Sequence, residues 1–83
     1  MKDIAWDAYQ IFIVVARQGG LTAAAEMTGL SPATLGRRMV ELEQRLGREL
    51  FLRSQTGYRL TPDGGQLLEQ LSELEAASRK VEE

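Results

Sequence analysis

Residues 21–39, LTAAAEMTGLSPATLGRRM, decide the fold of this 83-residue chain. The alanines favour a helix and leave a thin face that a second helix can approach closely. Gly29 suits the left-handed position that ends a helix, and Ser31-Pro32 is the cap and proline pair that begins one. Because only Gly29, Leu30 and Ser31 separate the two helices, they must cross sharply, and the stretch predicts a helix-turn-helix.

The sequence around this stretch predicts the remaining helices of a small bundle. No helix breaker lies between Asp7 and Gly19, so a first helix capped by Asp7 is expected there, and Thr22 is expected to cap the short second helix. The third helix is expected over residues 32–46. Its core face has spacings of four, three and four residues and consists of Leu35, Met39, Leu42 and Leu46.

After Gly47 the pattern changes from helical to strand-like. Two short apolar runs flank a turn, with Gly57 where a hairpin needs a positive φ, and this predicts a β-hairpin wing over residues 51–60. Thr61-Pro62 is a second cap and proline pair, and no helix breaker follows Gly65. The expected fold is mainly α: a winged helix-turn-helix of three helices plus a short hairpin, followed by a long linker helix.

Composition excludes several classes of function. The chain has no cysteine and no histidine, so thiolate chemistry and the commonest metal ligand and general base are absent. The acidic residues show no paired spacing, and no glycine loop is built to cradle phosphate. No enzyme activity, cofactor or metal is therefore expected. No apolar run approaches the length of a membrane span, so a cytoplasmic protein without membrane contact is expected.

The charge is unevenly distributed along the chain. Ten basic and twelve acidic residues give a net charge of −2, which by itself argues against a nucleic-acid partner. Residues 1–60 hold eight basic and six acidic residues, a net of +2, whereas residues 61–83 hold two basic and six acidic residues, a net of −4. The two segments are therefore read as separate units, a mildly basic domain (1–60) and an acidic linker and dimerisation helix (61–83).

The third helix is a candidate reader of DNA. Its N-terminal half carries Arg37 and Arg38, which could each hydrogen-bond a guanine, and Ala33 and Thr34, which could contact a thymine methyl. The alternative is a solvated face in which Glu41 pairs with the two arginines, worth about 0.2–0.5 kcal/mol per pair. The helix-turn-helix context favours DNA readout in the major groove.

Other polar residues are candidate backbone contacts. Thr22 and Ser31 are helix caps first, but a helix N-terminus with a hydroxyl also binds phosphate. The wing carries Arg53 and Arg59 around a tip that includes Thr56, and could lie on the DNA backbone or in the minor groove. For Arg59 an ordinary solvated hairpin is an equal alternative.

The last helix has an apolar seam with spacings of three and four residues, suited to contact with another helix. Its length exceeds what a small domain can cover, so we expect homodimerisation through it, with packing wholly on its own domain as the alternative. The seam residues expected at the dimer contact are Leu67, Leu71, Leu74, Ser78 and Val81.

The motifs together resemble the N-terminal DNA-binding domain of LysR-type transcriptional regulators. The resemblance spans nearly the whole chain, from Trp6 into the last helix. The segments that carry it, in order, are Leu21-Thr22-Ala23-Ala24-Ala25, Leu30-Ser31-Pro32-Ala33-Thr34-Leu35-Gly36-Arg37-Arg38-Met39, Leu42-Glu43, Leu46-Gly47, Leu50-Phe51, Arg53 and Leu60-Thr61-Pro62-Asp63-Gly64.

The resemblance implies a homodimeric bacterial transcription factor that binds specific double-stranded DNA. It implies that Pro32, Ala33, Gly36 and Arg37 face the major groove and that Arg53 contacts DNA at the wing. Gly36 departs from the family, which most often has serine there. Members normally continue into an effector-binding domain of two α/β lobes, so a small-molecule effector is expected only through a domain absent here, and the chain is expected to be a fragment.

Two other interpretations stay open on the sequence. One is a winged-helix protein-interaction and dimerisation module without DNA binding, which the net charge of −2 supports. The other is a winged helix of another bacterial regulator family, although the short wing and the Leu60-Thr61-Pro62-Asp63-Gly64 join favour the LysR type.

Overall fold

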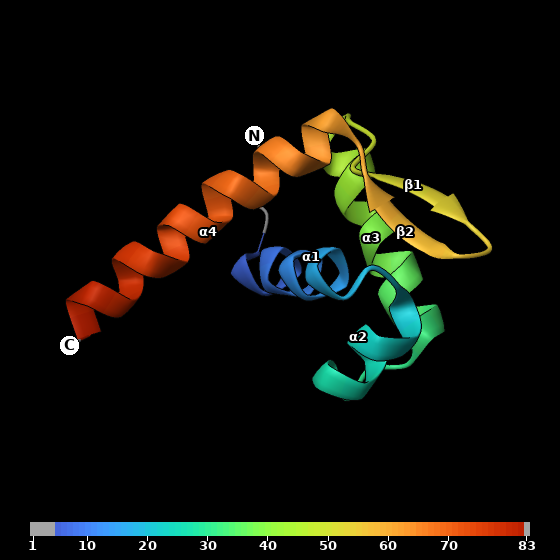
Figure 1. Cartoon of the computed structure of the whole chain (residues 1–83), viewed down its shortest axis with the longest axis horizontal. Helices are drawn as coiled ribbons and strands as arrows, with labels where there is room; N and C mark the ends of the chain where they lie inside the picture. The colour runs from blue at the N-terminus through green and yellow to red at the C-terminus, as the bar shows by residue number, and fades with distance from the viewer. Residues whose placement is uncertain (1–4, 83) are drawn as a thin grey trace.

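The structure, a computed structural model, describes residues 5–82, and side chains over residues 5–79. Four α-helices and one antiparallel hairpin follow one another in the order expected of a winged helix-turn-helix (Figure 1). The mainly α fold class is thereby confirmed. The elements are α1 (Trp6–Gln18), α2 (Leu21–Thr28), α3 (Pro32–Leu46), β1 (Phe51–Ser54), β2 (Gly57–Leu60) and α4 (Pro62–Glu82).

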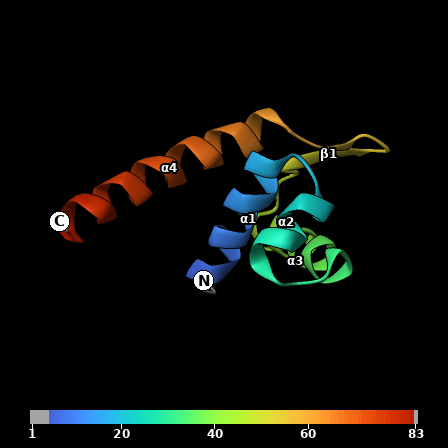
Figure 2. The same cartoon turned by 60° about the horizontal axis from the view of Figure 1, so that its bottom comes forward.

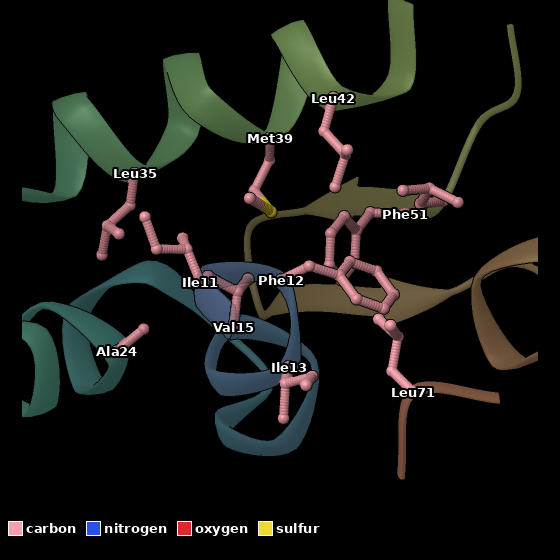
Figure 3. Close-up of a cluster of buried hydrophobic side chains, with 11 residues drawn as sticks. Ile11, Phe12, Ile13, Val15, Ala24, Leu35, Met39, Leu42, Phe51 and Leu71 are labelled. Carbon is pink, nitrogen blue, oxygen red and sulfur yellow. The ribbon is translucent and has the colours of Figure 1, made fainter. Parts of the chain in front are cut away.

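One hydrophobic core joins all of these elements except the outer part of α4 (Figure 3). The ring of Phe12 on α1 packs against that of Phe51 on β1, with centroids 5.3 Å apart, and both side chains are almost fully buried. The predicted core face of α3 is confirmed for Leu35, Met39 and Leu42, which are at most 2% exposed. Because α3 is buried along one stripe, its opposite stripe is left to solvent.

The helix ends follow the sequence signals in part. Gly19, Gly29 and Gly47 end α1, α2 and α3 with φ between 67° and 76°, the left-handed conformation that glycine adopts without a Cβ clash. The Ser31 hydroxyl accepts a hydrogen bond from the Thr34 amide at 3.1 Å, so Ser31 caps α3 as expected. Both signals place α3 at a defined angle to α2.

Two other predicted caps are wrong. The helix α1 begins at Trp6 with Ala5 as its cap residue, so Asp7 lies inside the first turn. The helix α2 begins at Leu21 with Gly20 as its cap residue, and Thr22 is already helical. The turn between α1 and α2 is shorter than expected because the Gly19 carbonyl is held by the Tyr58 amide at 2.9 Å and Leu21 packs on the core.

The wing is a tight hairpin with a two-residue turn. Phe51 pairs with Leu60, Arg53 with Tyr58 and Ser54 with Gly57, so the turn is Gln55-Thr56 and not the four residues expected. Gly57 has the positive φ that was predicted, 137°, and this lets Ser54 and Gly57 extend the ladder by one pair.

The helix α4 leaves the domain at a fixed point. The Thr61 hydroxyl accepts a hydrogen bond from the Gly64 amide at 2.9 Å and donates one to the Glu49 carbonyl at 2.6 Å, which confirms the predicted cap. Further along, Arg17 of α1 donates to Ser72 and Glu75 at 3.1 and 3.0 Å. Beyond this point α4 projects from the domain on the side opposite to the wing (Figures 1 and 2).

Candidate nucleic-acid interface

The exposed stripe of α3 begins at its N-terminus. Pro32, Ala33 and Arg37 are exposed, and Thr34 and Gly36 are half-buried. Among the side chains of residues 5–79, none forms an ion pair with Arg37. The predicted pairs with Glu41 are not found there either. The guanidinium of Arg37 is therefore available to a partner outside the domain.

Thr34 contributes to the cap as well as to the exposed stripe. The Thr34 amide donates a hydrogen bond to the Ser31 hydroxyl, and the Thr34 hydroxyl oxygen accepts one from the Ser31 hydroxyl at 2.9 Å. The two hydroxyls are therefore hydrogen-bonded to each other. A base or phosphate that used either of them would compete with the cap.

Arg38 points toward α1 and away from the stripe that carries Arg37. Its guanidinium lies 3.5 Å from the carboxylate of Asp7, and its side chain is 38% exposed. A pair this exposed contributes about 0–1 kcal/mol to stability, so its effect is on the direction of the side chain. The sequence suggested a base contact for Arg38 because the sequence of α3 does not show that Asp7 of α1 lies beside it.

Gly36 lies where α2, α3 and the wing meet. A Cβ built at this position would be 3.3 Å from a methyl group of Leu21 and 3.7 Å from the Tyr58 hydroxyl. The absence of a Cβ at Gly36 thus lets the side chains of Leu21 and Tyr58 approach α3 closely. The Leu21 methyl is the end of a flexible side chain, so a slightly larger residue would fit with a small shift.

The two wing arginines lie on opposite faces of the hairpin. Side chains alternate along a strand, and the register pairs Arg53 with Tyr58 but Arg59 with Leu52. Arg59 and Leu52 are exposed, whereas Arg53 lies on the face of the buried Phe51. The two arginines could not be assigned to separate faces from the sequence, because this requires the pairing register of β1 and β2.

Arg53 is held by a carboxylate from α3. Its two terminal nitrogens lie 2.8 and 3.3 Å from the Glu43 carboxylate, and its guanidinium stacks 5.0 Å from the centroid of the Tyr58 ring. The hydrogen bond to Glu43 raises the pKa of Arg53 above its usual value. The guanidinium of Arg53 is therefore already bound within the domain.

Glu43 has a structural role that the sequence analysis did not assign to it. Its carboxylate also accepts hydrogen bonds from the amides of Leu50 and Phe51, at 2.8 and 3.2 Å. Burial alone would raise the pKa of Glu43, but the hydrogen bonds from Arg53 and the two amides outweigh it and hold the pKa below its usual value. The sequence offered no signal for this pairing, because Arg45, Arg48 and Glu49 also lie between Glu43 and Arg53.

The tip of the wing and the start of α2 lie side by side. They line a shallow hollow of about 340 Å³, bounded by residues 19–23 and 54–58. Thr22 and Thr56 are exposed at this hollow, so the structure brings these two predicted backbone contacts together. The Thr56 hydroxyl is hydrogen-bonded to that of Ser54 at 2.9 Å.

The expected seam of α4 divides into two parts. Leu71 is 6% exposed and belongs to the domain's own core, and Leu67 is half-buried against that core. Leu71 thus packs within the domain, and its predicted role in dimerisation stays a prediction. Leu74 is 54% exposed and Ser78 is exposed, whereas the side chain of Val81 lies outside the described residues.

The described part of the chain offers neither a cluster of metal ligands nor a membrane-spanning helix. Within residues 5–82, no group of three or more acidic, cysteine or histidine side chains is placed to hold a metal ion. None of the helices in this part of the chain is long and apolar enough to cross a membrane.

The arrangement of α2, α3, the wing and α4 agrees with one protein family. The model of that family, the bacterial regulatory helix-turn-helix proteins of the lysR family, matches residues 6–65. The chain belongs to the LysR family. This confirms the resemblance drawn from residues 21–39 and from the Leu60–Gly64 join.

The curated relatives that this chain matches are longer proteins. The uncharacterized HTH-type transcriptional regulator YdcI of Escherichia coli is 46% identical over 57 residues, which are 69% of this chain and 19% of the relative. The HTH-type transcriptional regulator DmlR of the same organism is 37% identical over 60 residues, 72% of this chain and 20% of the relative. The chain thus spans about a fifth of the length of these relatives.

Solved structures of LysR-family domains share the fold. The DNA-binding domain of CbnR, in a crystal structure with DNA, superposes with a TM-score of 0.83 at 35% identity, covering 95% of this chain and 92% of that one. Full-length CbnR with its target DNA gives a TM-score of 0.82, and the match covers 28% of that longer chain. A complex of the BenM DNA-binding domain has a TM-score of 0.86 at 22% identity, which shows the shared fold alone.

Proposed function

We propose that this LysR-family chain binds double-stranded DNA at specific sequences and regulates transcription in the bacterial cytoplasm. The observation that carries the proposal is the exposed N-terminal stripe of α3, where Arg37 has no ion-pair partner among residues 5–79. The same fold is seen with DNA in the CbnR domain at 35% identity. A protein-interaction module without DNA binding is not favoured.

In this proposal α3 enters the major groove and the wing lies along the backbone or in the minor groove. The base contacts come from its first two turns, and Arg37 donates two parallel hydrogen bonds to a guanine. Thr22, Ser31, Thr56 and Arg59 contact the backbone. The residues proposed for base contacts are the exposed Pro32, Ala33 and Arg37 and the half-buried Thr34 and Gly36.

We also propose that the DNA-binding form is a homodimer. The exposed Leu74 and Ser78 follow the buried part of α4, so the outer part of this helix offers its apolar side to a second copy. No catalytic or cofactor role is proposed for this chain. An effector would act through a further domain of the longer regulator.

Selection of bound sequences from random DNA tests the function directly. Wild-type protein should enrich a palindromic motif, with affinity that falls steeply as salt rises. The variant Arg37→Ala should lose about 1–3 kcal/mol on the preferred site and discriminate less at one base position. Unchanged affinity and unchanged preference in Arg37→Ala would refute the assignment of α3 as the reading helix.

The variant Arg59→Ala is the matched comparison. It removes the same charge from the wing, where a backbone contact carries no base information. Affinity should fall evenly across sequences, and the slope of the salt dependence should fall by about one. No binding of wild-type protein to mixed genomic DNA at low salt would overturn the proposed function as a whole.

A further inference from the structure

The carboxylate of Glu43 on α3 binds groups from the loop and the strand that lead into the wing. Glu43 lies on the last turns of α3, and its oxygens accept hydrogen bonds from the amides of Leu50 and Phe51, where the chain enters the wing. The same oxygens bind both terminal nitrogens of Arg53 on β1. The carboxylate is 11% exposed, so solvent competes little for these bonds.

The contacts of Arg53 continue this arrangement across the hairpin. Its guanidinium lies over the ring of Tyr58, whose edge packs on Phe51 with centroids 5.2 Å apart. The Tyr58 amide in turn donates to the Gly19 carbonyl, at the turn before α2. Through these contacts the pair from α3 and β1 sets the angle of the wing relative to both helices of the helix-turn-helix.

We infer that Glu43 is a positioning residue for DNA binding, and that Arg53 acts as its partner and not as a contact to DNA. Four donors converge on the carboxylate, and they come from the loop and strand that carry the wing. Arg59 and Thr56 reach the DNA backbone because this anchor holds the hairpin in place. The inference rests on the proposed DNA binding and assigns the mechanism that places the wing.

The sign of one substitution separates positioning from simple charge. Glu43→Gln removes a negative charge close to the DNA-binding face, so electrostatics alone predicts equal or tighter binding to a polyanion. If Glu43 positions the wing, Glu43→Gln weakens binding by about tenfold, within the range of coupling between contacting residues. The matched control is Glu41→Gln, because Glu41 is exposed on the same helix and its side chain forms no ion pair among residues 5–79. This control should leave affinity unchanged or raise it.

Footprinting shows whether the loss is confined to the wing. In Glu43→Gln, hydroxyl-radical protection should disappear at the flanks that the wing covers, whereas protection of guanine N7 by α3 should remain. A purely structural loss would weaken both parts of the footprint together. All measurements are made at a temperature where circular dichroism shows each variant folded.

Arg53→Gln is the second variant, and it keeps the carboxylate with its two backbone hydrogen bonds. It should weaken binding as much as Glu43→Gln, and the double variant should be no weaker than either single one. If Arg53 contacts phosphate directly, Glu43→Gln frees it and binding tightens, and the losses no longer coincide. Tighter or unchanged binding in Glu43→Gln overturns the inference.

A readout without DNA separates this inference from the proposed function. Amide exchange at Leu50 and Phe51 should be about tenfold faster in Glu43→Gln than in wild type and unchanged in Glu41→Gln. Unchanged exchange at both amides shows that Glu43 does not hold the wing and overturns the inference even if DNA binding is confirmed. Faster exchange in a protein that fails to bind DNA would instead confirm the anchor and reject the DNA-binding function.

Discussion

The helices α3 and α4 start alike and end differently. Each begins with a hydroxyl cap followed by proline, Ser31-Pro32 in α3 and Thr61-Pro62 in α4. The helix α3 then buries one stripe along its length, whereas α4 buries Gly64 and Leu71 and leaves Leu74 exposed. The same start signal therefore serves a helix completed by its own domain and a helix that projects beyond it (Figure 2).

The difference shows that helix formation and helix burial are separate questions. Capping and the absence of breakers decide where a helix begins and how far it runs. Whether its apolar side is covered depends on how much of the domain lies beside it. The core of α3 is surrounded by α1, α2 and the hairpin, but only the first half of α4 lies over α1.

The largest expected effect is on the free energy of unfolding, and it distinguishes a buried leucine of α3 from an exposed leucine of α4. Leu35→Ala in α3 should lower the free energy of unfolding by about 2–5 kcal/mol, because the side chain is fully buried. Leu74→Ala in α4 should change it by less than about 0.5 kcal/mol at a concentration where the protein is monomeric. Urea denaturation followed by circular dichroism measures both. Equal losses would mean that Leu74 is covered within the monomer.

An intermediate effect is expected at one glycine in each helix. A Cβ at Gly64 would overlap the Leu50 carbonyl oxygen of the backbone, so Gly64→Ala should cost about 1–3 kcal/mol by overpacking. The Cβ of Gly36→Ala meets the flexible end of Leu21 and lies in ordinary contact with the Tyr58 hydroxyl, so this variant should be neutral or gain up to about 1 kcal/mol in helix propensity. Thermal unfolding of the two variants provides the test. A loss at Gly36 as large as that at Gly64 would contradict this account.

The smallest expected effect is on self-association through the outer part of α4. Leu74→Glu places a charge on the exposed seam, and should weaken self-association by about tenfold or more, equivalent to about 1.4 kcal/mol, with little effect on the monomer. Sedimentation at several concentrations measures it, with Ser78→Ala as the mild comparison. A dimer constant that is unchanged in Leu74→Glu would place the partner surface elsewhere.

Sequence reasoning succeeded where local signals decide structure. Ser31-Pro32, Thr61-Pro62 and Gly57 each act through bonds within a few residues, and each was found where expected. It failed at Thr22, since α2 begins one residue earlier, at Leu21, with Gly20 as its cap residue.

The candidate interface was predictable to the same extent. The exposed stripe of α3 follows from helical periodicity, so the placement of Arg37 was predictable. The directions of Arg38 and Arg53 were not, because Asp7 and Glu43 lie on other elements and reach them only in the folded chain.

The sequence by itself determined the element order and the helix-turn-helix, since these rest on caps, breakers and spacing, and its motifs carried the resemblance to the LysR family. Only the tertiary structure decided which charges remain available to a partner. The Glu43–Arg53 ion pair joins residues ten positions apart, one on α3 and one on β1, which the fold brings together. Such pairs depend on distances in space, and no local pattern in the chain encodes those distances.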